Sequence, residues 1–364
     1  MRLFQNSGLY PTYRQRLDRL SKYTTTFAGR LDIFLNDRYG ACHFLKPVLD
    51  RDSSAFFTNG DDDILQQRWA KEHGLPGKTT LEDILLAQIE HHRTEVFYNI
   101  DPMRYSSDFV RKLPGCVRKS IAWRAAPSLG ADFSAYDLVV CNFPSILESY
   151  RRNGWKAAYF SPAHDPEMNV YADNTDRPID VLFVGGYTRH HRRRATLLEA
   201  VGAQASRFNV IMHLDCSRLT RLAESPIGMV LPLTKHRRPH MVSSVAQPPV
   251  FGRDLYTALG RSKIVLNGAV DMAGDSRGNM RCFEAMGCGS LMISDKGTYP
   301  AGMVDGETMR TYDSAVDAVS LMQESLRDGA WQPIAQSGFQ MIRERYSKQA
   351  QWKNFILLVE GLES

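Results

Sequence analysis

The stretch that decides the fold reads Asn279-Met-Arg-Cys-Phe-Glu-Ala-Met-Gly-Cys-Gly289, and the apolar run Ser290-Leu-Met-Ile-Ser294 follows it directly. The first part predicts a loop that opens a short helix, which ends at the glycines, and the apolar run predicts a buried strand. Such a helix presents free backbone amides to an anion, and Glu284 can hold a second polar part of the same ligand. This combination suits a nucleoside diphosphate with its ribose.

The composition is that of a soluble globular protein. The chain has 364 residues, enough for two domains, of which 43% are hydrophobic and 23% are charged. A net charge of +5 allows an anionic ligand. It is too modest to indicate the strongly basic face expected of a nucleic-acid-binding protein. No run approaches the ~20 apolar residues that span a bilayer, and no N-terminal segment resembles a secretion signal. Six scattered cysteines, none in a Cys-x-x-Cys pair, indicate neither disulfides nor a zinc site.

From these features we expect a cytoplasmic protein. Its positive charge leaves peripheral association with the inner face of a membrane open, and the sequence does not indicate an oligomeric state.

Apolar runs alternate with helical patterns along the whole chain, which predicts parallel α/β layers. In the first half we expect helices at 66–73, capped by Asp61-Asp-Asp63, at 81–89 and at 144–153, with strands at 55–58, 95–100, 117–123, 137–141 and 156–160. A polar connector at 166–178 precedes a second series. There we expect helices at 193–201, 254–260 and 315–326, with strands at 179–184, 209–214, 227–231, 263–267, 291–294 and 308–312.

The two series predict two doubly wound Rossmann-like domains, residues 1–165 and 179–345, that face a central cleft. Ligands bind at the carboxyl ends of parallel strands, so the residues just after each strand are candidates. In the second domain these are Gly185, Gly186, Tyr187, Arg189, Asp215, Asn267-Gly268 and the loop 274–280.

The loop after the first strand of this second domain has two interpretations. Gly185 and Gly186 allow the backbone to approach a phosphate, and Arg189 can neutralise a diphosphate leaving group. The alternative is a tight turn before a solvated basic turn of helix, which we favour for 192–194. A nucleic-acid patch is a weaker alternative, because no aromatic residues interleave with the basic ones.

Three segments resemble the GT-B-fold glycosyltransferases: Gly278–Gly289, Ser262–Asn267 and Asp180–Gly186. The chain is similar to the group with a "glycosyl transferases group 1"-like C-terminal domain, which includes the spore-maturation-type glycosyltransferases, over residues 179–350. The resemblance implies a GT-B fold whose terminal helix, in 346–364, packs back on the N-terminal domain through Trp352 and Phe355.

The resemblance also implies a donor site. It assigns Glu284 to the ribose hydroxyls and the amides of Gly278, Asn279 and Met280 to the diphosphate. Arg281 matches an arginine typical of the group, and Lys263 or Arg189 supplies further charge; Tyr187 and His213 complete the expected nucleotide-sugar site. Related retaining enzymes carry a Glu, seven residues and a second Glu, and here Ser276 takes the first place. Retention and inversion both stay open.

The first domain is expected to bind the acceptor. If the enzyme inverts, Asp101, which follows the strand 95–100, is the candidate base; the alternative, a cap before Pro102, is the one we favour. Further candidates for the base are His43, His164 and Asp165. Three residues near the presumed first strand can touch the acceptor or pack at the surface: Tyr10, Tyr13 and Arg14.

We predict no cofactor and no metal, because arginine, lysine and helix-end amides can stabilise a departing diphosphate and Asp61-Asp-Asp63 is expected in a surface cap. The predicted function is transfer of a sugar from a nucleotide-diphosphate sugar to a glycan, lipid-linked, protein or small-molecule acceptor, with no nucleic acid as partner. Two alternatives remain: a non-catalytic GT-B-like module that binds a nucleotide sugar or glycan, and a nucleotide-sugar epimerase.

Overall fold

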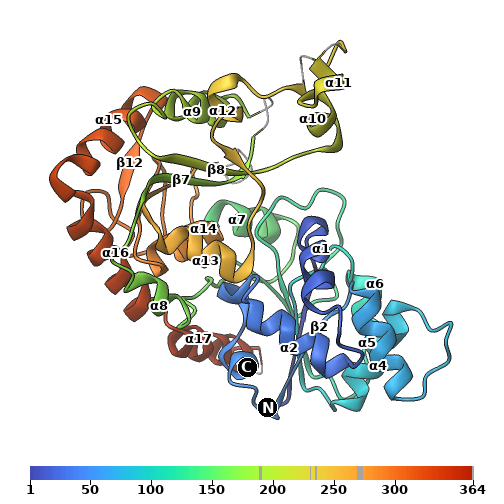
Figure 1. The fold of residues 1–364 in the computed structure, drawn as a ribbon. Coiled ribbons are helices and arrows are strands. Elements are labelled where there is room, and N and C mark those ends of the chain that lie inside the picture. Colours follow the sequence, from blue (N-terminus) through green and yellow to red (C-terminus); the bar gives the residue numbers. More distant parts are fainter. Residues whose placement is uncertain (188–190, 230, 234–235, 269–273, 363–364) are drawn as a thin grey trace. The chain divides into compact units, whose positions relative to one another are not determined.

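The chain forms two compact α/β units (Figure 1). The computed structural model describes residues 1–187, 191–229, 231–233, 236–268 and 274–362. One unit comprises Met1–Ala163 with Lys348–Ser364, and the other comprises His164–Ser347. Each contains one six-stranded sheet whose neighbouring strands are all parallel, which confirms the predicted fold class.

The N-terminal unit has the strand order β2-β1-β3-β4-β5-β6. Its strands are β1 (Leu3–Ser7), β2 (Ala55–Asn59), β3 (Val96–Asn99), β4 (Lys119–Trp123), β5 (Leu138–Cys141) and β6 (Ala157–Tyr159). Its helices are α1 (Pro11–Leu20), α2 (Phe27–Asp37), α3 (Lys46–Leu49), α4 (Asp63–Glu72), α5 (Leu81–His91), α6 (Ser107–Val110), α7 (Pro144–Arg152) and α17 (Lys348–Glu360), with a 3-10 turn η1 (Ala41–His43). The central strands β3 and β5 are buried along their whole length, as apolar runs covered on both faces should be.

The C-terminal unit has the strand order β12-β11-β10-β7-β8-β9. Its strands are β7 (Ile179–Gly186), β8 (Val210–Asp215), β9 (Ala246–Gln247), β10 (Ser262–Leu266), β11 (Leu291–Asp295) and β12 (Arg310–Tyr312). Its helices are α8 (Met168–Ala172), α9 (Arg192–Gly202), α10 (Arg218–Ala223), α11 (Pro226–Met229), α12 (His240–Ser243), α13 (Gly252–Gly260), α14 (Met280–Gly287), α15 (Ala315–Leu326) and α16 (Trp331–Arg345), with a 3-10 turn η3 (Arg327–Gly329).

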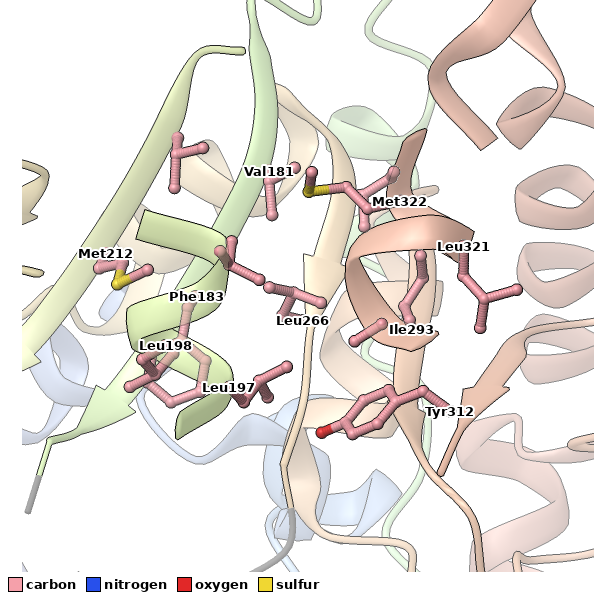
Figure 2. Packing of buried hydrophobic residues seen from close by; sticks show 14 of the residues in the cluster. Val181, Phe183, Leu197, Leu198, Met212, Leu266, Ile293, Tyr312, Leu321 and Met322 are labelled. Carbon is pink, nitrogen blue, oxygen red and sulfur yellow. The ribbon is translucent and has the colours of Figure 1, made fainter. Parts of the chain in front are cut away.

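The core of the C-terminal unit lies between its sheet and the helices α9 and α15. Figure 2 shows side chains of β7, β8, β10 and β11 meeting those of the two helices. Val181, Phe183 and Leu198 are among the members that are at most 3% exposed. Burial of this apolar surface fixes the strand order, because each strand must present its side chains to the same pair of helices.

Two elements differ from the sequence predictions. The prediction of a strand at 227–231 is wrong, because Pro226–Met229 forms the short helix α11. A short apolar run fits helix and strand equally by periodicity, and Pro226 is suited to the first position of a helix. Within the expected connector, Met168–Ala172 forms helix α8, which contacts α13 and α14.

Each unit has a buried cation that is bound by backbone carbonyls. Lys348, at the start of α17, is 4% exposed, and its Nζ donates to the carbonyls of Ala41 (2.7 Å), Phe44 (2.7 Å) and Cys42 (3.0 Å). In the C-terminal unit Arg177 donates to five carbonyl groups and one hydroxyl, those of Tyr171, Ala172, Asn174, Ser262, Cys288 and Ser290. These cations join segments that are far apart in the sequence.

We expect Lys348→Met to lower the free energy of unfolding by about 3 kcal/mol, because the thioether fills a similar volume but removes the charged donor that three buried carbonyls share. Chemical denaturation followed by circular dichroism measures the change. Lys353→Met on the exposed face of the same helix is the control and should change stability by less than about 0.5 kcal/mol. Equal effects of the two substitutions would contradict the role of Lys348.

Candidate functional site

The strand order of the C-terminal unit reverses between β7 and β10. From β7 the chain proceeds to β8 on one side, and from β10 it proceeds to β11 on the other. The carboxyl ends of β7 and β10 therefore form a crevice, the usual ligand position of such a sheet. Gly185 and Gly186 end β7, and Asn267 follows β10. A Cβ on Gly186 would meet no atom within 4 Å among the described residues, so this edge has room for a ligand.

Helix α14 begins at this crevice. Gly278 has a φ of 120°, which favours glycine, and brings the loop after β10 into the helix. The Asn279 side chain does not cap the helix among the described residues; its Nδ2 donates instead to Oδ1 of Asn267 (3.1 Å). The first amides of α14, including those of Met280 and Arg281, thus lack a side-chain cap from Asn279 and are suited to bind an anion.

A buried ion pair lies one turn inside α14. Nη1 of Arg281 donates to Oε2 of Glu284 at 2.7 Å, and Glu284 is only 4% exposed. Glu284 is therefore not an ordinary exposed residue of the helix. Nε of Arg281 is buried and has no hydrogen-bond partner among the described residues. A buried donor of this kind is costly unless a ligand or water pairs with it.

His213 lies on β8 beside this ion pair. Its Nδ1 donates to the carbonyl of Pro248 at 2.6 Å, so Nε2 is the acceptor of the neutral ring. Burial, and then the charge of Arg281, lower the pKa of His213, which keeps the ring neutral. At the end of the same strand, burial raises the pKa of Asp215, which pairs in register with Gly186.

A second feature of this edge is a basic cavity of about 550 Å³. Five cationic side chains and two carboxylates line it: Arg192, Arg193, Arg194, Arg277, Lys296, Asp295 and Asp313. Arg277 pairs with Asp295 at 2.6 Å, Lys296 pairs with Asp313, and Arg194 donates to the Gly268 carbonyl. Arg192 and Arg193 are exposed and form no ion pair within the described part of the chain.

This cavity contains residues that the sequence analysis missed. Arg192 and Arg193 in the first turn of α9 are exposed, in agreement with the favoured interpretation, and together with Arg194 they also line the cavity. Arg277 belongs to the candidate loop 274–280, whereas Lys296 was not considered. Lys296 follows β11 directly, so the rule that ligands bind after parallel strands could have identified it.

Some predicted donor residues lie elsewhere. Lys263 is at the amino end of β10, away from the crevice, and pairs with Asp180 at 2.6 Å. The hydroxyl of Tyr187 donates to Glu199 of α9 at 2.7 Å. Arg189 lies outside the described residues. The structure thus brings Gly185, Gly186 and His213 to the same edge as residues 278–284, and it separates Lys263 from them.

Ser276, where related enzymes carry an acid, is 7% exposed and forms a parallel bridge with Thr298. The amide of Arg277 donates to the Thr298 carbonyl at 2.8 Å, and the Thr298 amide donates to the Asp275 carbonyl at 2.7 Å. Position 276 is therefore a buried position of a short backbone ladder. A long acidic side chain there would need a different local structure.

The N-terminal unit has its own pocket at the corresponding position of its sheet, between β1 and β3. The pocket measures about 600 Å³, and its lining includes Gly8, Tyr10, Tyr39, Asp61 and Asp101. Asp61 and Asp62 were predicted in a surface cap, but they are 7% and 1% exposed; Asp62 caps α4 as expected, and Asp61 turns into the pocket.

The two carboxylates of this pocket have altered proton affinities. Burial raises the pKa of Asp61 to about 6, and the charge of Asp101 adds to the effect, although Leu9 N donates to Asp61 at 2.9 Å. Burial also raises the pKa of Asp101, whose carboxylate lies 3.5 Å from Nε of Arg104. The Asp101 carbonyl accepts the Tyr105 amide in a turn, as the alternative interpretation predicted, and the role of Asp101 as a base stays a prediction. Raised carboxylate pKa values are typical of acid and base sites.

Of the three acceptor candidates near the first strand, Tyr13 and Arg14 have structural roles. Tyr10 lines the pocket and is 55% exposed. Tyr13 is buried and donates to Asp37 (3.0 Å), and burial raises the pKa of its hydroxyl. Arg14 donates to the Asp61 carboxylate at 3.1 Å and thus holds a side chain that lines the pocket.

The three further base candidates are in contact with protein groups. Burial and Lys348 lower the pKa of His43 to about 3. Nε2 of His164 lies 2.8 Å from the Asn169 amide oxygen, and Asp165 accepts the Tyr256 hydroxyl at 3.3 Å.

Within the described ranges, no three His, Cys, Asp or Glu side chains gather as a metal site would require. No helix in the described part of the chain is both long and apolar enough to cross a membrane.

Comparison with known proteins gives both a family and a fold. Residues 189–356 match the "Glycosyl transferase-like" family model. Over 99% of this chain and 100% of the other, the structure resembles HepE of Anabaena in complex with UDP and glucose (TM-score 0.59, 12% identity). A glycosyltransferase from Rickettsia africae (0.53, 12%; 100% and 98% covered) and sucrose-phosphate synthase from Thermosynechococcus elongatus (0.54, 13%; 99% and 98% covered) are also similar. No curated protein sequence matches significantly.

The family match over residues 189–356 and the shared fold support a glycosyltransferase of the GT-B fold. At 12% to 13% identity the solved structures establish the fold, while the family match over the C-terminal unit carries the enzyme class.

The raised pKa of Asp61 predicts a pH dependence of stability. The folded protein binds this proton more tightly than the unfolded chain, so the stabilisation is complete below the ordinary pKa of 3.8 and is lost as the pH rises through about 6. Relative to Asp61→Asn, the wild-type free energy of unfolding should fall by about 2 to 3 kcal/mol between pH 3.5 and pH 7. Denaturation at a series of pH values measures this difference. Asp63→Asn, at a carboxylate that is 73% exposed, is the control and should give a flat difference.

Proposed function

We propose that this GT-B glycosyltransferase takes its sugar from a nucleoside-diphosphate sugar and transfers it, without a metal ion, to a hydroxyl-bearing acceptor. One observation carries the proposal: free amides of α14 and the buried Arg281–Glu284 pair lie together at the crevice between β7 and β10. Amides and cations suit a diphosphate, and a buried carboxylate suits the hydroxyls of a ribose.

The geometry of the pair supports a role in binding. Arg281 bonds Oε2 of Glu284, so the other carboxylate oxygen can accept a ribose hydroxyl. The buried Nε of Arg281 offers an unused donor for a phosphate oxygen. Together with the amides of α14, these groups would hold the diphosphate at one end and the ribose at the other.

The basic cavity supports departure of the nucleotide. When the bond between the anomeric carbon and the diphosphate oxygen breaks, the leaving group gains negative charge. Arg192 and Arg193, which no described carboxylate neutralises, can offset that charge as a metal ion would. HepE was solved with UDP-glucose, so UDP-sugars are the first donors to test.

The acidic pocket of the N-terminal unit supports a role in activating the acceptor. A carboxylate with a raised pKa accepts a proton from an attacking hydroxyl more readily than an ordinary one. Asp101 would take this proton as the acceptor oxygen bonds the anomeric carbon, and Tyr10 would contact the acceptor. Asp61, with a pKa of about 6, would keep the local negative charge low near neutral pH by holding a proton part of the time.

A donor screen tests the proposal. UDP-, GDP- and dTDP-sugars should be compared by thermal shift. The nucleotide sugars that raise the melting temperature identify the donor. CMP-linked sugars, which lack a diphosphate, should give no shift. Glu284→Gln should weaken nucleoside-diphosphate binding at least tenfold in calorimetry, because a charged hydrogen bond is lost.

Glu344→Gln, at an exposed position of α16, is the matched control and should bind as the wild type does. Unchanged binding by Glu284→Gln would contradict the site. The buried Ser276 favours one competing function, a module that binds the donor without transfer. Release of the nucleotide from the bound donor, in the presence or absence of acceptor, separates the enzyme from that module.

Asp101→Asn should reduce sugar transfer at least a hundredfold and leave donor affinity unchanged, because the amide cannot accept the proton. Transfer rates with a radiolabelled donor, and the anomeric configuration of the product by NMR, measure the effect. A base-assisted single displacement inverts the anomeric centre, so retention would contradict this role. Asp108→Asn, at a carboxylate that is 86% exposed, is the control.

A further inference from the structure

The described residues of 216–239 form an arm between β8 and α12. Its helices are α10 and α11, and Figure 1 shows them beyond the carboxyl end of β8, off the layer formed by α9 and α15. The two helices contact each other. The arm is thus a separate element, and neither the donor crevice nor the basic cavity includes its residues.

The interior of the arm is polar and tightly packed. Nε of Arg237 donates to the Ala223 carbonyl at 3.0 Å, and its Nη2 donates to the carbonyls of Leu231 (3.1 Å) and Gly228. Nε of Arg238 donates to Glu224 at 2.8 Å. A Cβ at position 228 would lie 1.8 Å from the Leu222 carbonyl oxygen, so α10 and α11 meet at a glycine. These bonds give the arm a defined shape.

The exterior of the arm is apolar. Leu219 is 50% exposed, Leu222 44%, Ile227 70% and Leu231 40%. A soluble surface element usually buries such side chains and exposes its arginines, whereas here Arg237 and Arg238 are turned inward. Exposed apolar side chains that gather on one element mark an interaction surface.

The charge of the arm indicates what covers this surface. Between residues 216 and 239 the sequence has five arginine and lysine residues and a single acid, Glu224, which Arg238 neutralises. Arg218 and Arg221 are exposed on α10, beside the apolar residues, and form no ion pair within the described part of the chain. Apolar residues flanked by cations fit a surface that offers acyl chains beneath negative headgroups.

We propose that the arm docks the protein on an anionic lipid bilayer, with Leu219, Leu222 and Ile227 in the headgroup boundary and Arg218 and Arg221 on the lipid phosphates. A second copy of the chain is a poorer occupant. In a symmetric pair the same patch would face itself, and the unpaired arginines would repel each other. The docking does not depend on the identity of the donor.

Vesicle binding tests the proposal with the full chain. Flotation with phosphatidylcholine vesicles that contain a quarter phosphatidylglycerol should recover the protein, and pure phosphatidylcholine vesicles should recover much less. Because the headgroup attraction is screened, 0.5 M salt should weaken the binding. Equal recovery with both vesicles, or none with either, would overturn the proposal.

Paired substitutions locate the surface. Arg218→Ser with Arg221→Ser, and separately Leu222→Ser with Ile227→Ser, should each lower the partition coefficient at least about tenfold. All four side chains are exposed, so the melting temperature should stay unchanged. Two controls should bind as the wild type does: Arg118→Ser with Arg152→Ser (74% and 73% exposed), and Val316→Ser with Leu357→Ser (80% and 56% exposed).

Two further outcomes would show that the arm does not bind lipid. Binding that survives both arm variants would place lipid contact elsewhere on the chain. A dimer seen by light scattering without lipid, and abolished by the leucine and isoleucine changes, would show that a second copy covers the apolar side chains. Either result overturns the proposal.

Discussion

The right-handed crossover of parallel strands is the constraint on which both sites depend. The chain crosses the sheet in one direction from β7 to β8. It crosses in the opposite direction from β10 to β11. Right-handed connections therefore place α9 and α14 on opposite faces, and neither helix covers the edge between them. The contacts agree, since α9 packs with α15 and α14 packs with α16. The same reversal between β1 and β3 creates the edge that holds the acidic pocket.

The two edges have opposite electrostatics. At the donor edge three carboxylates are paired with cations: Asp295 with Arg277, Asp313 with Lys296, and Glu284 with Arg281. The positive charge that remains comes from the first turn of α9 and the amides of α14. At the acidic pocket, by contrast, burial leaves carboxylates that hold protons more tightly than usual. Stabilisation of a departing anion and removal of a proton need these different environments.

Most of the fold could be predicted from the sequence because the strands are buried on both faces. Runs such as 137–141 and 291–294 are continuous and apolar, and turn residues bound them. The run 227–231 has a similar composition and length, so periodicity does not distinguish strand from helix there. Ile227 and Leu231 are exposed, and no periodicity in the sequence reveals that difference.

The candidate site could be predicted from the sequence where one segment supplies it, as at residues 278–284, and the binding role of that segment stays a prediction. It was not predictable where distant segments meet. Asp61 was taken for a surface cap because three acids before a helix usually form one, and only β1 and β3 together enclose it. Lys263 lies away from the candidate site for a simpler reason. It is at the amino end of β10, where it forms an ion pair with Asp180.

The serine at position 276 is best understood from its surroundings. Ser276 is buried in a short backbone ladder with Thr298, and the neighbouring cation Arg277 forms an ion pair with Asp295. A glutamate at this position would be a buried charge, which is costly unless a cation pairs with it. The ladder and the serine are therefore mutually consistent, and position 276 has no carboxylate with which to contact a donor sugar. A mechanism that needs a carboxylate at position 276 lacks that group here. A displacement assisted by Asp61 and Asp101 does not need it.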